Sequence, residues 1–185
     1  MKALRVLHNC IVAAVMLLWA FGSAAAQTAK LDDLFQQLQT STDEESVQIT
    51  QNIWIEWSKS GSPAMDLLLK RGRDALSAGN PQEAIEHFTA LIDHAPNFAE
   101  GYNARATAYY QVGELGPSIS DIAKTLTLNP RHFGALSGLG QIFEQLNEPK
   151  KALEVYKAAL AVNPHMTDVV DAVKRIEAEL AGQDI

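Results

Sequence analysis

The segment from Phe133 to Met166 reads FGALSGLGQIFEQLNEPKKALEVYKAALAVNPHM, and its pattern determines the fold of the chain. Residues 146–149 (LNEP) divide it into two stretches that suit a pair of helices, and Asn163-Pro164 closes the second stretch. The same step of Asn or Ala followed by proline occurs earlier at Pro130 and at Pro96, and the three prolines are evenly spaced. The sequence therefore predicts three helix pairs in one register, over residues 65–98, 99–132 and 133–166.

Small and large side chains recur at fixed places in the three windows. Small residues occupy two equivalent positions, namely Gly72, Ala106 and Gly140 at the first and Ala84, Ser118 and Ala152 at the second. Small side chains at both places let the two helices of a window approach closely. Large apolar side chains are expected to fill the space beside them. Those side chains are Phe88, Tyr109, Phe143 and Tyr156.

This pattern resembles the tetratricopeptide repeat, whose signature is W-x2-L-G-x2-Y, then A-x3-F, then P, on a period of about 34 residues. The second window departs from it most, because Ser118 and Ile122 replace the Ala and Phe. The three windows cover about 100 of the 159 residues after position 26. The resemblance implies an all-α fold, an α-α superhelix of three helix-turn-helix repeats.

Helical segments are expected on both sides of the array. Residues 167–185 are predicted to form a C-terminal capping helix, because Val169, Val173 and Ile176 share one stripe. Residues 27–64 are predicted to form an N-terminal helical segment, with Thr42 and Glu45 as a capping box. This segment is either a degenerate fourth repeat or an unrelated cap, in which case Ser62-Pro63 starts the next helix.

Two tryptophans in this segment allow two interpretations. Trp54 and Trp57 share one helix face, and Trp54 falls in the register position that Phe88 has one window later. Packing against the first repeat is the expected role. An exposed aromatic docking patch is the alternative.

Residues 1–26 have the pattern of a secretory signal peptide. Lys2 and Arg5 give a positive start, residues 10–21 (CIVAAVMLLWAF) form an apolar run of 12, and small residues end on an A-x-A pattern at Ala26. An uncleaved membrane anchor is the alternative, but a span needs about 20 apolar residues. We therefore expect cleavage near Ala26, a periplasmic or secreted location, and membrane contact only through this segment before cleavage.

Removal of that segment makes the chain more acidic. Loss of Lys2 and Arg5 from the 15 basic residues leaves 13 against 22 acidic residues, so the formal net charge goes from −7 to −9. Nucleic acid and anionic lipid surfaces attract basic proteins, so neither is an expected partner. Cys10 is the only cysteine and leaves with the segment, so no disulfide or thiolate nucleophile is expected.

No catalytic site, metal site or cofactor is expected, and the protein is not expected to be an enzyme. The sequence after residue 26 contains no G-x-S-x-G or H-E-x-x-H motif. Its histidines, at no recognisable metal-ligand spacing, are His87, His94, His132 and His165. Three of the four stand beside or just before the repeat prolines, where they are expected to cap helix C-termini at the surface.

The first helices of the pairs line the concave side of such a superhelix. The resemblance implies that exposed residues there bind a peptide or a helix of a partner protein. Helical periodicity nominates Leu69, Arg73 and Leu76 from the first repeat, Asn103, Thr107, Tyr110 and Gln111 from the second, and Ser137, Gln141, Glu144 and Gln145 from the third. Amide side chains there can bond a peptide backbone, and Leu and Tyr offer apolar contacts. A merely soluble polar face is the alternative.

One subtype of the family is disfavoured. Chaperone-docking tetratricopeptide domains hold a C-terminal carboxylate with a clamp of Lys and Asn. The matching positions here are Leu69, Arg73, Ala104, Gly134 and Gly138, of which only Arg73 suits that role.

These features predict an exported adaptor or scaffold that mediates protein–protein interaction through its concave groove. The alternative is a structural or self-associating subunit of a cell-envelope assembly, which would use the convex face or exposed tryptophans. The sequence identifies neither the partner nor the oligomeric state.

Overall fold

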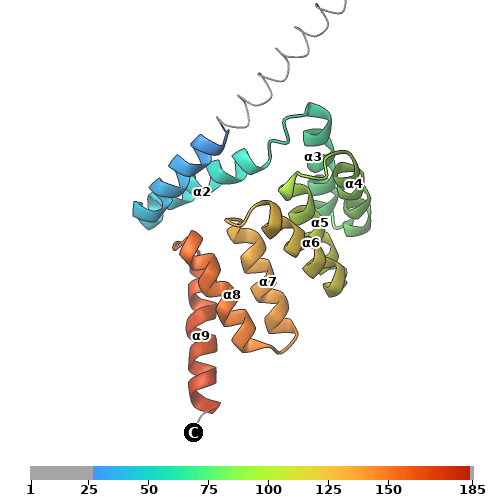
Figure 1. Cartoon of the computed structure of the whole chain (residues 1–185). Helices are drawn as coiled ribbons and strands as arrows, with labels where there is room; N and C mark the ends of the chain where they lie inside the picture. The colour runs from blue at the N-terminus through green and yellow to red at the C-terminus, as the bar shows by residue number, and fades with distance from the viewer. Residues whose placement is uncertain (1–26, 184–185) are drawn as a thin grey trace, which may run out of the picture.

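The computed structural model describes residues 27–183, and the regular elements in that range are all helices. Residues 27–40 are helical, and they are followed by α2 (Asp43–Trp57), α3 (Pro63–Ser77), α4 (Pro81–His94), α5 (Ala99–Gln111), α6 (Leu115–Leu128), α7 (Phe133–Gln145), α8 (Pro149–Val162) and α9 (Thr167–Gln183). The pairs α3–α4, α5–α6 and α7–α8 stack in chain order, and α9 packs on α8 (Figure 1). The predicted all-α superhelix is confirmed.

The turns inside the pairs repeat as the sequence does. Gly79, Gly113 and Asn147 occupy the same place in the three repeats, and all three have positive φ, at 78°, 80° and 57°. In each turn the following amide reaches back five residues, as when the Asn80 N–H donates to the Ala75 carbonyl over 2.9 Å. These are Schellman motifs, in which a residue in the left-handed conformation lets the amides of the turn donate to the last carbonyls of the first helix.

The predicted small residues do allow the helices of a pair to approach closely. An added Cβ at Gly72 would lie 2.3 Å from the Phe88 ring, and one at Gly140 would lie 2.3 Å from the Tyr156 ring. The aromatic ring therefore occupies the place of the missing side chain. This packing holds the two helices of the first and third repeats together.

The second repeat departs from this packing in a consistent way. Its first small residue is Ala106, which has a methyl group, and Ile122 stands where the other repeats have an aromatic ring. Both side chains are buried in one cluster. The hydroxyl of Ser118, fully buried beside them, donates to the Ala106 carbonyl over 2.8 Å. A hydrogen bond and an aliphatic contact thus replace the ring-on-glycine contact.

Helix 27–40 and α2 form an N-terminal hairpin, residues 27–57. The predicted capping box is confirmed, since Thr42 Oγ1 accepts from the Glu45 N–H while the Glu45 carboxylate accepts from the Thr42 N–H. The hairpin lies across the turns that join successive repeats (Figure 1). There the Gln39 amide donates to the Val162 carbonyl over 2.8 Å, and the Trp57 ring lies 4.9 Å from that of Phe133.

Trp54 does not pack in the way that Phe88 does, although it shares the register position. Its ring covers Gly134, where an added Cβ would come within 2.6 Å of it. The expectation that the tryptophans pack on the first repeat is therefore wrong, because their neighbours in the array are His132, Phe133 and Gly134, where the second repeat ends and the third begins. α3 begins at Pro63, with Ser62 as its N-cap residue.

Among residues 27–183, no helix combines the length and apolar character that a membrane crossing requires. The predicted signal peptide, residues 1–26, lies outside the described residues.

Candidate binding groove

Two adjoining hollows follow α5 and α7. The larger, about 610 Å³, is bounded by α2, α7 and the start of α9. The smaller, about 80 Å³, lies between α5 and α7. Thr107, Gly134, Gly138 and Gln141 line both hollows, which therefore form one continuous surface, called the binding groove below.

The lining of the groove changes along its length. Apolar side chains concentrate at the end between α2 and α9, where they are Val47, Trp54, Phe133, Met166 and Val169. On the α5 side, hydroxyl and amide groups of Asn103, Thr107 and Tyr110, with Gln141 from α7, lie beside the apolar side chains of Ile122 and Ile142. Such a surface offers an occupant both apolar contacts and hydrogen bonds to its backbone.

Five of the nominated residues line this groove, and they are Asn103, Thr107, Tyr110, Ser137 and Gln141. Gln141 and Tyr110 are exposed, and their side chains make no hydrogen bond within residues 27–183. Ser137 is only 9% exposed. Gln111 and Gln145 are exposed on α5 and α7 but line neither hollow.

The nominated residues of the first repeat lie elsewhere. Leu69 is 2% exposed in the core between α3 and α5, so its assignment as an exposed groove residue is wrong. Leu76, two turns later on the same stripe, is half-buried against that core. The stripe therefore packs the first repeat onto the second. Arg73 points to Glu100 and to Ser58, whose hydroxyl it contacts over 2.9 Å.

In the third repeat, Glu144 is likewise engaged within the protein. Its carboxylate accepts from the Tyr156 hydroxyl over 2.7 Å and is paired with Arg175. Burial and the neighbouring Glu144 carboxylate both raise the pKa of Tyr156, so its hydroxyl stays protonated and donates. Glu144 braces α7 against α8 and α9.

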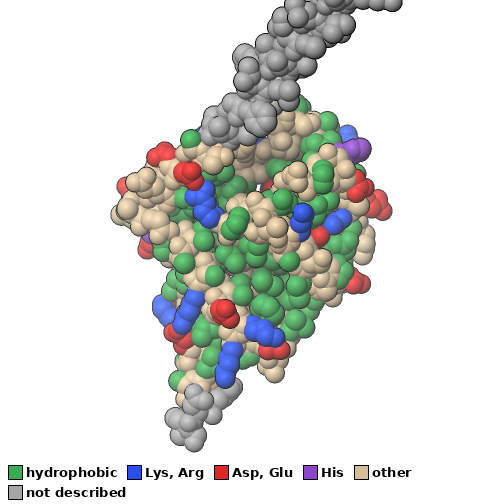
Figure 2. Space-filling model, in the orientation of Figure 1, with side chains coloured by type: hydrophobic (Ala, Val, Ile, Leu, Met, Phe, Trp, Pro, Cys, Tyr) green, Lys and Arg blue, Asp and Glu red, His purple; other side chains and the backbone are tan. Residues whose placement is uncertain are grey.

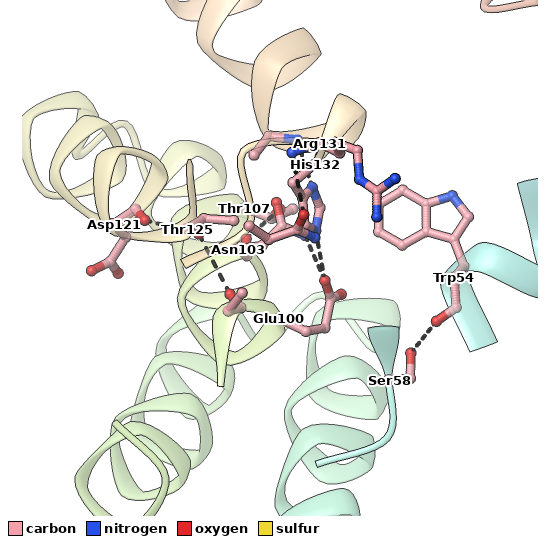
Figure 3. Close-up of polar contacts among 12 residues, drawn as sticks. Trp54, Ser58, Glu100, Asn103, Thr107, Asp121, Thr125, Arg131 and His132 are labelled. Atoms are coloured by element: carbon pink, nitrogen blue, oxygen red, sulfur yellow. Dashed lines mark hydrogen bonds and ion pairs between the residues drawn. The ribbon is translucent and has the colours of Figure 1, made fainter. Parts of the chain in front are cut away.

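A buried polar cluster joins α3, α5 and the start of α7 (Figure 3). Its centre is Glu100, 3% exposed, whose carboxylate accepts from Arg73, from Asn103 over 3.3 Å and from His132 Nε2 over 2.9 Å. His132 Nδ1 accepts from the Ala135 N–H over 3.0 Å, and this assigns the ring proton to Nε2. The cluster fixes the end of α5 that carries Asn103.

The sequence suggested that His132 caps a helix C-terminus at the surface, but the structure places it elsewhere. It is fully buried and is the N-cap residue of α7. The Trp57 ring stacks on its imidazole with 4.2 Å between centroids. The prediction is wrong because residue 132 directly precedes α7, and because Trp57, which lies far away in the sequence on α2, covers the imidazole ring.

The part played by α2 in the groove could not be read from the sequence. Ser46, Val47, Thr50 and Trp54 face the larger hollow, although no local pattern links them to α7. Within residues 27–183, no three His, Cys, Asp or Glu side chains gather as metal ligands would.

Comparison with known proteins gives a consistent result. The tetratricopeptide repeat family model matches residues 69–121 and 103–166. A TPR repeat-containing protein of Rhizobium etli is 30% identical over 161 residues, which cover 86% of this chain and 79% of that relative. Hsp70-Hsp90 organizing protein 1 of Glycine max is 26% identical over 106 residues, but these span 57% of this chain and only 18% of the relative.

Solved structures share the fold. The first TPR of Spaghetti (RPAP3), bound to the HSP90 peptide SRMEEVD, has a TM-score of 0.60 and 24% identity, covering 63% of this chain and 93% of that chain. The MamA protein has a TM-score of 0.60 and 19% identity, covering 86% of each chain. At these identities the likeness concerns the fold alone.

Proposed function

Since this chain belongs to the tetratricopeptide repeat family, we propose that it is an adaptor whose binding groove holds a peptide or helix of a partner protein. The observation that carries the proposal is the continuity of the groove along α5 and α7. The side chains of residues 27–183 leave the groove open. Tyr110 and Gln141 face it with polar groups that make no hydrogen bond within those residues. Grooves of this kind take a partner's segment by backbone hydrogen bonds and apolar contacts.

The relatives support a role in protein interaction. One similar structure holds an HSP90 peptide, and several relatives are Hsp70-Hsp90 organizing proteins. None of the relatives and structures named here carries the name of an enzyme. We extend this to the present chain as a non-catalytic adaptor with no cofactor.

We further propose that the adaptor is exported, to the periplasm or the exterior, by cleavage of a signal peptide near Ala26. The charged start, the apolar run and the A-x-A ending support this. The mass of the protein from the periplasmic fraction and the medium tests it, with a mature N-terminus near Gln27 expected. A full-length protein that remains in the cytoplasm would reject export and leave the groove proposal standing.

Gly138 provides a direct test of the groove. An added Cβ there would meet only Ile122 Cδ1, at 3.9 Å, so the fold has room for a side chain that would project into the groove. In Gly138→Leu we expect unchanged or slightly higher stability, because Gly costs about 1 kcal/mol relative to Ala inside a helix. We expect the variant to lose partners that the wild type captures from its native cells.

Gly116→Leu is the matched control, because this glycine on α6 has open space around its Cβ position and lines neither hollow. It should capture the same partners as the wild type. A triple variant, Asn103→Ala/Tyr110→Ala/Gln141→Ala, should share the loss seen in Gly138→Leu. Unchanged capture by both groove variants rejects the groove as the binding surface.

A self-associating subunit of an envelope assembly is the second candidate. Figure 2 shows hydrophobic side chains gathered in the middle of one face, over α6 and α7, with charged side chains around them. An apolar area of this kind suits an interface between copies of the chain. Light scattering separates the two candidates, since the adaptor is expected to leave its groove open in solution. A stable oligomer that protects Gln141 from solvent would favour the subunit.

A further inference from the structure

The binding groove carries very little charge. Among the described residues that line its two hollows there is no Lys or Arg, and Asp168 is the one carboxylate. His165, the one imidazole among them, already contacts Asp43 over 2.7 Å and the Leu38 carbonyl over 3.0 Å. The groove therefore offers an occupant one free charge, and that charge is negative.

Basic side chains near the groove are engaged by acids of this chain. Arg73 is paired with Glu100, which is 3% exposed, and Arg175 is paired with Glu144. Taking either cation away would remove the ion pair of a carboxylate and leave it only its other hydrogen bonds, and for the buried Glu100 this loss is costly. An acidic occupant thus finds no cation ready to receive it.

Asp168 is differently placed. It lies in the first turn of α9, at the positive end of the helix dipole, and it is exposed. It makes no hydrogen bond or ion pair within residues 27–183. Its neighbours in the lining include Met166, whose apolar side chain is half-buried. An apolar surface beside a carboxylate suits the long side chain of Lys or Arg, whose methylenes pack while the head pairs.

The net charge of the chain acts in the same direction. Residues 27–185 contain 13 basic against 22 acidic residues, a formal charge of −9. A field of this sign draws cationic segments toward the protein and repels acidic ones.

We propose that the groove selects a protein segment that carries Lys or Arg and lacks Asp and Glu. Its cation lies beside Asp168, its apolar side chains contact Val47 and Trp54, and its backbone bonds to Gln141. This inference rests on the proposed function, because it names the chemistry of the occupant of the same groove. It also sets the chain apart from a protein that holds an acidic peptide such as SRMEEVD.

A phage-displayed library of random short peptides, selected on the purified protein, tests this inference. Clones that bind the wild type and Gly116→Leu but not Gly138→Leu are kept, because they depend on the groove. We expect these peptides to be enriched in Lys and Arg and depleted in Asp and Glu relative to the unselected library. Groove-dependent peptides that are acidic or uncharged overturn the inference and leave the proposed function intact. Selection that yields no groove-dependent peptide rejects the proposed function, and the inference with it.

The role of Asp168 is tested with one selected Lys-containing peptide and its Lys→Gln form. We expect Asp168→Asn to weaken binding of the Lys peptide by about tenfold, with little effect on the Gln form. Asp171→Asn is the matched control, one turn later on α9 and outside the lining, and it should bind as the wild type does. An Asp168→Asn protein that keeps the full preference for the Lys peptide places the cation elsewhere and overturns the assignment.

Discussion

At the scale of single residues, Gly140 shows how the repeat depends on a missing side chain. The Tyr156 ring lies where a Cβ would be, and it is 2% exposed, so it has little room to move away. We expect Gly140→Ala to lower the free energy of unfolding by about 1–3 kcal/mol, despite the better helix propensity of Ala. Denaturant unfolding measures this, and Gly116→Ala should show no loss. Equal stability of the two variants would mean that the ring is not confined.

Ala106 and Ile122 in the second repeat predict a compensating pair. A phenyl ring at position 122 would meet the Ala106 methyl group, because the rings of the other repeats lie over glycine. Ile122→Phe alone should therefore destabilise the protein, and Ala106→Gly added to it should restore part of the loss. A double-mutant cycle by denaturant unfolding is expected to give a favourable coupling of about 0.5–3 kcal/mol. Additive effects would contradict this packing.

The small positions were predictable from the sequence because they recur at the same place in each repeat. Leu69 and His132 were not, because their roles depend on neighbours outside their own repeat. Leu69 has the spacing of an exposed face, but α5 covers that face. His132 has the neighbours of a surface cap, but Trp57 and Glu100 enclose it.

At the scale of elements, aromatic contacts hold the N-terminal hairpin on the array where the second and third repeats meet. Trp57 is 7% exposed and touches both His132 and Phe133. Trp57→Ala is expected to cost about 3–5 kcal/mol. Hydrogen exchange should then quicken most at the amides of α2, while those of α8 stay protected.

The control for this prediction is Val47→Ala on the same helix. Val47 is 69% exposed, so its truncation should leave exchange in α2 almost unchanged. If Trp57→Ala instead quickened exchange equally in every helix, the hairpin would not be a separate unit docked on the array.

Glu56 makes the stability of the hairpin sensitive to acid. Burial alone would raise the pKa of Glu56, but the ammonium groups of Lys30 and Lys59, 2.6 and 2.7 Å from Oε1, outweigh it and hold the pKa below its usual value of 4.5. A lowered pKa in the folded state gives stability that is present above pH 4.5 and is lost as pH falls through the folded pKa.

Tryptophan fluorescence during acid titration tests this, because Trp54 and Trp57 lie in the same hairpin. Glu56→Gln should be less stable at neutral pH and should lose less stability than the wild type below pH 4.5. Identical acid transitions in the two proteins would exclude Glu56 as the responsible group.

Local sequence signals were sufficient to predict where several of the helices begin and end. Thr42 with Glu45 marked the start of α2, and the repeat prolines marked the ends of α4, α6 and α8. The docking of the hairpin had no such signal, because it joins Trp54 to Gly134, which lies at the start of the third repeat and far away in the sequence. Periodicity reports which face of a helix is apolar, but it does not report which distant surface covers that face.

At the scale of the whole molecule, the hairpin changes the nature of the groove. In a stacked array, each repeat contacts only its nearest neighbours. The hairpin, by contrast, reaches from α3 to the turns before α7 and α9. It thereby adds a wall from α2 to a groove that the sequence assigned to the first helices of the repeats alone. Five of the eight residues nominated on the second and third repeats line the hollows, whereas none of the three nominated on the first repeat does.

The measurement that tests the groove most directly is photocross-linking from single positions. Gln141 and Gln82 are both exposed glutamines on helices, but Gln141 lines the groove and Gln82, on α4, does not. With a photoreactive residue at each position in turn, in the native cells, we predict a cross-linked partner from position 141 and none from position 82. A partner cross-linked only from position 82 would contradict the assignment of the groove as the binding surface.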